Sequence, residues 1–134
     1  MSPEQLLGQL ESGGRFALGD MEAGVGTLSR MPEGSLDLAL VVVEPGAKSL
    51  EVGRRAIEML RERKVAPWLV IANKVRGQED VDLVRRELAL DDVHVVPEDE
   101  AIVRADMRGV SAYDSDPDSP AVRAVRQLGE RLQA

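Results

Sequence analysis

The chain has 134 residues, of which 43% are hydrophobic, and this is enough apolar material for one folded domain. Its formal net charge of −7 argues against nucleic-acid binding, because phosphate contacts need clustered lysine and arginine side chains. The lack of cysteine and the single histidine, His94, exclude disulfide bonds, thiolate metal sites and histidine-cluster metal sites.

The N-terminal part of the sequence predicts a helix, a strand and a long loop. Leucines recur at helical spacing over residues 3–12, and the glycine pair that follows ends this helix. A short apolar run that begins at Phe16 predicts a strand over residues 16–20. The loop at residues 21–36 contains three glycines and a proline. The first strand therefore leads into an acidic loop that glycine interrupts.

Beyond residue 36, apolar runs alternate with helical spacings. Strands are predicted at residues 38–43, 68–72 and 93–96, and helices at residues 49–64, 78–88, 99–107 and 120–132. Ser49 and Ser119 are the expected helix caps. The unbroken apolar run at residues 38–43 is typical of a central parallel strand that is buried on both faces. The sequence thus predicts one α/β domain over residues 1–134, with three layers and a mostly parallel sheet of about four strands.

Polar or loop-forming residues follow each predicted strand. They are Asp20 to Glu22, Glu44 to Gly46, Asn73 with Lys74, and Pro97 to Asp99. In an open parallel sheet, ligands bind beyond the carboxyl ends of the strands. A carboxylate at a strand end, followed by a glycine that lets the backbone approach a ligand, is the usual arrangement for Mg²⁺ beside a phosphate. Asp20 and Gly24 match this pattern.

Four strings carry a resemblance to a known family: GDMEAGV at residues 19–25, VVVEPGAKSLE at 41–51, ANKVR at 72–76 and VPEDE at 96–100. They resemble the deviant P-loop ATPase superfamily of chromosome-partitioning and septum-site-determining proteins. Within it, they resemble most the accessory ATPases that insert nickel into carbon monoxide dehydrogenase. The resemblance runs from about Leu6 to Leu132 and matches the C-terminal half of the family pattern, which implies a truncated P-loop NTPase-like fold.

The resemblance also implies roles for individual residues. Asp20 would hold Mg²⁺ through water, and the backbone of Gly24 would face the γ-phosphate of ATP. Asn73 would hydrogen-bond the adenine edge, and the loop at residues 97–99 would pack along the other side of the base. The implied nucleotide-binding set is Asp20, Glu22, Gly24, Asn73, Lys74, Pro97, Glu98 and Asp99, and the implied ligands are ATP or ADP with Mg²⁺. The alternative is that Asp20, Asn73 and Asp99 are loop residues with a structural role only.

One part of the family pattern is missing from the sequence. A P-loop, G-x-x-x-x-G-K-[ST], supplies the backbone amides and the lysine that neutralise the phosphates, and no such string occurs in these 134 residues. We therefore expect weak nucleotide binding and no hydrolysis by the isolated chain. The paired cysteines of the nickel proteins are absent as well, which argues against metal delivery.

Three functions follow as hypotheses. The chain is a P-loop-less interaction or regulatory module, a split ATPase whose site is completed in trans, or an adenine-nucleotide sensor linked to metalloenzyme maturation. In the resembled family the P-loop strand lies in the middle of the sheet, and its absence would leave unpaired strand edges. We therefore expect the remaining strands to close up, two copies to associate, or a P-loop-bearing partner to fill the gap.

The remaining patterns have structural explanations. The acidic residues 114–118 resemble the start of a calcium loop but lack its glycine and its final glutamate, so a turn and helix cap is expected. His94 is expected to be structural. No apolar run approaches the ~18 residues that span a membrane, and the N-terminus lacks a secretory signal pattern. A soluble cytoplasmic protein is the simplest expectation.

Overall fold

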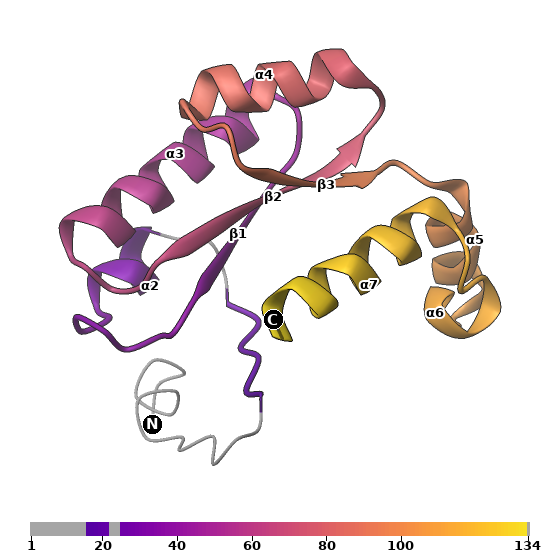
Figure 1. Ribbon diagram of the computed structural model, residues 1–134, viewed down its shortest axis with the longest axis horizontal. Helices are drawn as coiled ribbons and strands as arrows, with labels where there is room; N and C mark the ends of the chain where they lie inside the picture. The colour runs from indigo at the N-terminus through magenta and orange to yellow at the C-terminus, as the bar shows by residue number, and fades with distance from the viewer. Residues whose placement is uncertain (1–15, 22–24, 134) are drawn as a thin grey trace.

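A three-stranded parallel sheet forms the centre of the computed structural model, which describes residues 16–21 and 25–133 (Figure 1). Strands β1 (Ala39–Val43), β2 (Trp68–Val75) and β3 (Val93–Pro97) lie side by side in the order β1-β2-β3. Val41 lies opposite Val70, which in turn lies opposite Val93. The predicted parallel α/β fold is confirmed, with three strands in the described residues rather than about four.

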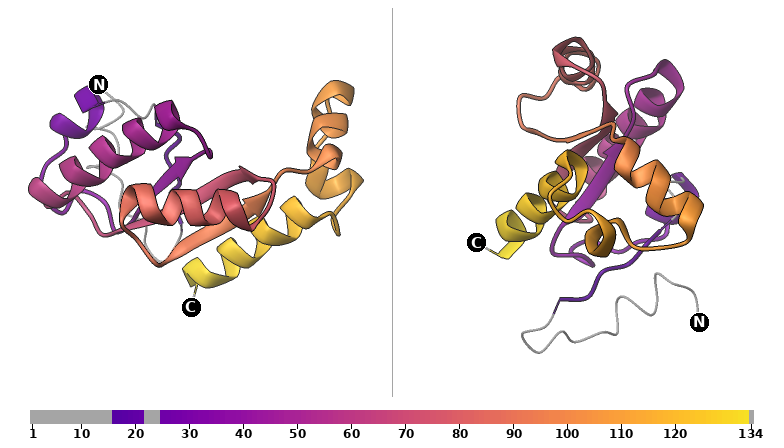
Figure 2. Two further views of the ribbon diagram at one scale, coloured as in Figure 1. Left: turned by 90° about the horizontal axis from the view of Figure 1, so that it is seen from above. Right: turned by 90° about the vertical axis from the view of Figure 1, so that its right-hand side faces the viewer.

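Helices cover both faces of the sheet, which gives the predicted three layers (Figures 1 and 2). The chain contains α2 (Val25–Ser29), α3 (Ala47–Glu62), α4 (Gln78–Leu88), α5 (Glu100–Arg108), α6 (Ala112–Ser115) and α7 (Pro120–Gln133). Helices α3 and α4 pack on one face, and α7 packs on the other. Helices α5 and α6 extend beyond the end of β3 (Figure 2).

The hydrophobic core is divided between the two faces. On the α3 and α4 side, Val43, Val70 and Leu60 are almost completely buried. On the α7 side, Leu69 and Ile71 of β2 contact the start of α7. Both faces of β2 are therefore covered, which explains its unbroken apolar sequence.

The strand predicted at residues 16–20 does not form. This segment runs as extended chain outside the sheet (Figure 1), and the side chains of Phe16 and Leu18 are 73% and 88% exposed. An isolated strand has no partner for its backbone hydrogen bonds, so an apolar run alone does not make one. In the described structure no neighbouring strand lies beside this segment.

The prediction that β1 is a central strand buried on both faces is also wrong for the described residues. β1 pairs with β2 only, and its exposure alternates: Val41 and Val43 are buried, whereas Val42 is 58% exposed. Val42 lies on the face that α7 covers, but α7 packs mainly over β3. Among residues 16–21 and 25–133, nothing therefore covers one edge and part of one face of β1.

The helices follow the sequence pattern with local differences. The helix expected from Ser49 begins earlier, at Ala47, and Ser49 Oγ instead accepts a hydrogen bond from the backbone amide of Glu44 at 2.9 Å. Helices α2 and α6 were not anticipated from the sequence. His94 is structural as expected, because its Nε2 donates to the backbone oxygen of Ala124 at 2.8 Å. The helix predicted at residues 3–12 lies outside the described residues.

Candidate functional site

The loops at the carboxyl ends of the three strands form the candidate site. Parallel pairing brings these ends to one edge of the sheet. Asn73 and Lys74 lie near the end of β2, and Pro97 at the end of β3 is paired with Val75. The backbone amide of Glu98 donates to the carbonyl oxygen of Val75 at 2.9 Å, which ties the loop after β3 to β2.

An ion pair joins the ends of β1 and β2. Lys74 Nζ lies 3.3 Å from Glu44 Oε1, and both side chains are more than half exposed. Lys74 also has a left-handed backbone conformation, with φ at 57°, which residues with a Cβ rarely adopt. Neither the ion pair nor the left-handed conformation of Lys74 has a local sequence signal, so neither was predictable from the sequence.

A second ion pair fixes the chain just beyond this loop. The backbone amide and the Nε of Arg76 both donate to Asp80 Oδ2, at 2.9 and 3.1 Å. Hydrogen bonds from Arg76 hold the pKa of the Asp80 carboxyl below its usual value, and the same side-chain hydrogen bond raises the pKa of Arg76. The first turn of α4 is thereby anchored to the end of β2.

The carboxylate of Asp99 joins two helices. Its Oδ1 accepts from the amide of Ala101 in α5, and its Oδ2 accepts from the amide of Ala121 in α7, both at 2.9 Å. These amides, that of Ala121 foremost, hold the pKa of Asp99 below its usual value although partial burial opposes this. Both oxygens of Asp99 are therefore engaged in helix capping, which is a structural role.

Of the predicted magnesium-loop residues, Asp20 alone lies in the described part of the chain. Asp20 is exposed and belongs to the segment outside the sheet, whereas Glu22 and Gly24 lie outside the described residues. No group of three histidine, cysteine, aspartate or glutamate side chains within the described ranges could hold a metal ion. Asp20 is a single carboxylate, whereas Mg²⁺ is usually held by one or two carboxylates together with phosphate oxygens and water.

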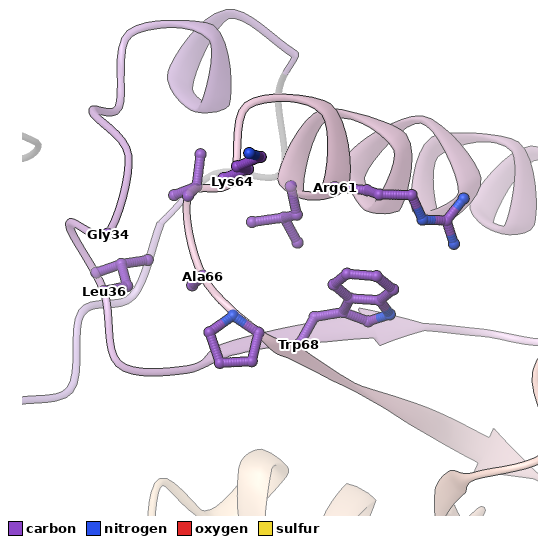
Figure 3. A pocket seen from close by; sticks show the side chains of 9 residues that line it. Gly34, Leu36, Arg61, Lys64, Ala66 and Trp68 are labelled. Carbon is purple, nitrogen blue, oxygen red and sulfur yellow. The ribbon is translucent and has the colours of Figure 1, made fainter.

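A shallow hollow lies at the other end of the sheet, where β2 begins (Figure 3). Its volume is about 350 Å³, and its walls are mostly apolar, with Arg61 and Lys64 at the end of α3. The guanidinium of Arg61 lies over the ring of Trp68, 5.3 Å from its centre. This hollow is separate from the strand-end loops, and its cations have an ordinary explanation as residues that stabilise a helix C-terminus.

Known proteins match this chain over most of its length. Relatives include an uncharacterized ATP-binding protein of Methanocaldococcus jannaschii, 33% identical over 67% of this chain and 36% of the relative. The carbon monoxide dehydrogenase accessory protein CooC of Rhodospirillum rubrum is 34% identical over 73% of this chain and 38% of the relative. Among solved structures, the MinD cell division protein of Aquifex aeolicus matches with a TM-score of 0.60 and 25% identity. That match covers 75% of this chain and 45% of MinD.

The chain is a partial relative of the deviant P-loop ATPases. No protein-family model matches it. It spans less than half the length of CooC and MinD, so the family relationship concerns one part of the ATPase fold. A MinC:MinD complex of Aquifex aeolicus also matches, with a TM-score of 0.60. No helix in the described part of the chain is long and apolar enough to cross a membrane.

Proposed function

We propose that this chain is an interaction module that pairs with a P-loop-bearing polypeptide to form a shared adenine-nucleotide site. The chain would contribute the loops that contact the base, which are those at residues 73–74 and 97–99 and are called the base-side loops below. The observation that carries the proposal is the open edge of β1. Within the described residues β1 pairs with β2 alone, and Val42 on its α7 side is 58% exposed. Open strand edges are usually covered or blunted in stable proteins, because they recruit other chains.

A P-loop unit would cover both the open edge of β1 and Val42. A P-loop consists of a strand, the phosphate-binding loop and a helix. Its strand would pair with the open edge of β1, and its helix would lie beside α7 over Val42. A strand added in parallel to β1 would end level with Glu44, next to the loop that contains Asn73 and Lys74. The phosphate cradle would then stand beside the base-side loops.

The relatives support this assignment. A protein described as ATP-binding matches this chain over 36% of its own length, so most of that protein lies outside the match. These 134 residues contain no G-x-x-x-x-G-K-[ST], so the phosphate cradle would belong to another polypeptide segment. The MinD neighbour found in complex with MinC supports a partner-dependent role.

The deciding experiment is recovery and reconstitution of the partner. The tagged chain should capture from its own cell lysate a protein that contains a P-loop. The purified pair should bind ATP with Mg²⁺ in calorimetric titration, whereas the chain alone should give little heat. Turnover by the pair would make it a split ATPase. Binding of ATP by the chain alone as tightly as by the pair, without turnover, would favour the sensor, and a strict monomer with no P-loop-bearing partner would contradict the proposal.

Replacing Val42 with aspartate should abolish capture of this partner. Val42 is exposed, so the substitution should leave the fold intact while placing a charge where the partner's helix would pack. Val103→Asp is the matched control, because Val103 on α5 is 57% exposed and lies outside the sheet. We expect loss of capture for V42D only, measured by co-purification. If both variants lost capture of the partner equally, or if neither lost it, β1 would be excluded as the docking edge.

Replacing Asn73 with alanine should weaken adenine-nucleotide binding by the pair about tenfold, the effect of one lost specific hydrogen bond. Asn73 is half-buried at the end of β2 and is the single asparagine of the chain. Gln127→Ala, which removes an exposed amide from α7, is the control. Calorimetry with ATP measures the affinity, and thermal unfolding should give similar midpoints for all three proteins. Unchanged ATP affinity in N73A would exclude Asn73 as a base ligand.

A further inference from the structure

We infer that the ion pair between Glu44 and Lys74 positions Asn73 for contact with the nucleotide base. This inference rests on the proposed function, because it concerns how the same loop is shaped. Glu44, which was not among the predicted site residues, would be a positioning residue of the site. Lys74 would likewise position Asn73 rather than contact the ligand directly.

The first observation is an extra residue in β2. Ala72 lies opposite Val95 of β3, and the next paired residues are Val75 and Pro97. β2 thus advances three residues while β3 advances two, so the strand contains a bulge at Asn73 and Lys74. A bulge interrupts the alternation of side chains along a strand and redirects one of them. Bulges are common beside functional sites, where they re-aim a side chain.

The second observation is that both sides of the bulge are fixed. Before it, Ala72 is paired with Val43 of β1 and with Val95 of β3. After it, the carbonyl of Val75 accepts from the amide of Glu98, and Asp80 holds Arg76. Asn73 and Lys74 are therefore a short protrusion between two anchored segments, and the conformation of Lys74 decides how Asn73 is presented.

The third observation concerns what holds Lys74. Its φ of 57° is unfavourable for a residue with a Cβ, so a side-chain contact would help to hold it. The ion pair to Glu44, at 3.3 Å, is the contact that the described structure offers its side chain. The backbone of Glu44 is held in turn, because its amide donates to Ser49 Oγ at 2.9 Å. The pair thus connects the start of α3 to the bulge in β2.

Nuclear magnetic resonance tests this inference directly on the full chain. Because Asn73 is the single asparagine, selective ¹⁵N-asparagine labelling gives one backbone amide and one side-chain amide group. Adenosine is the probe, since it has no phosphate that Lys74 could contact. In the wild type, adenosine should shift the side-chain amide of Asn73. Glu44→Lys should weaken this response about twofold to fivefold, by releasing the bulge.

A charge-reversed ion pair distinguishes a positioning role of Glu44 and Lys74 from an effect of the changed charge alone. The double reversal Glu44→Lys with Lys74→Glu restores an ion pair of opposite polarity and should restore the adenosine response. Glu51→Lys is the control, because Glu51 pairs with Arg54 and Arg55 on α3 and should not affect Asn73. Circular dichroism should show the same fold in every variant.

The possible results are distinguishable. Weakening in the single variant with rescue in the double variant supports the inference. If adenosine shifts Asn73 equally in wild type and E44K, or if the double reversal fails to rescue, the positioning role is overturned and the proposed base site stands. If adenosine does not shift Asn73 in the wild type, both the positioning role and base binding at this loop are overturned.

Discussion

Replacing Asp99 with alanine is expected to lower the free energy of unfolding by about 2 kcal/mol, since each lost helix cap costs about 1 kcal/mol. The two oxygens of this carboxylate accept from Ala101 in α5 and from Ala121 in α7. The variant would leave both amides without their acceptor and would loosen α7 from the loop after β3. Urea unfolding followed by circular dichroism measures the change.

Two further variants sharpen this experiment. Asp99→Asn retains one acceptor oxygen and should be intermediate in stability. Asp118→Ala removes an exposed carboxylate a short distance before α7 and should change the free energy of unfolding by less than about 0.5 kcal/mol. If D99A were no less stable than D118A, the double cap would not contribute to folding.

The contribution of Asp99 should also depend on pH in a defined direction. Because the amides of Ala121 and Ala101 lower its pKa in the folded state, the folded protein binds this proton less readily than the unfolded chain. The stabilisation is therefore present above about pH 4, the usual aspartate pKa, and is lost as the pH falls through the lowered value. The stability difference between wild type and D99N should shrink in acid. A difference that stays constant from neutral pH to pH about 2 would contradict this cause.

Replacing Gly53 with alanine should destabilise the protein by about 1–2 kcal/mol, although alanine normally favours a helix interior. A Cβ at Gly53 of α3 would lie 2.5 Å from Cγ1 of Val43 in β1. Val43 is 1% exposed, and its branched side chain has few alternative rotamers, so the clash cannot be relieved by a small shift. Close packing of α3 on β1 therefore requires glycine. Thermal or urea unfolding gives the measurement.

Gly129 provides the matched control. It lies inside α7, and a Cβ there would meet no atom within 4 Å. Gly129→Ala should therefore stabilise the protein by about 0.5–1 kcal/mol through helix propensity. Shortening the side chain of Val43 should relieve the clash. Gly53→Ala should therefore lower the free energy of unfolding by less in a Val43→Ala background than in the wild type. Equal effects of the two glycine substitutions would show that α3 is not packed tightly on β1.

Elements with strong local signals were predictable from the sequence. The helical spacing of apolar residues placed α4 at residues 78–88, and the start of β2 at Trp68 was anticipated from an unbroken apolar run. Both signals are intrinsic to a short segment, because periodicity records which side of that segment faces apolar surroundings. The same local strings carried the resemblance to the deviant P-loop ATPases, which the comparisons confirm.

The candidate site was predictable only in part. The polar strand ends that contain Asn73 and Pro97 were expected at one edge of the sheet, and the structure brings them together there. The double cap of Asp99 was not predictable, because its two acceptor bonds reach helices that begin far apart in the sequence. The pairing of Glu44 with Lys74 likewise depends on the alignment of β1 with β2.

The sequence by itself determined the α/β class, the parallel alternation of strands and helices, and the family, because these follow from local patterns of apolar, glycine and polar residues. Only the tertiary structure decided that residues 16–20 lie outside the sheet and that, within the part of the chain it describes, β1 has an open edge with Val42 exposed. The physical reason is that an apolar run records a preference for burial, whereas strand pairing depends on which other segment lies beside it.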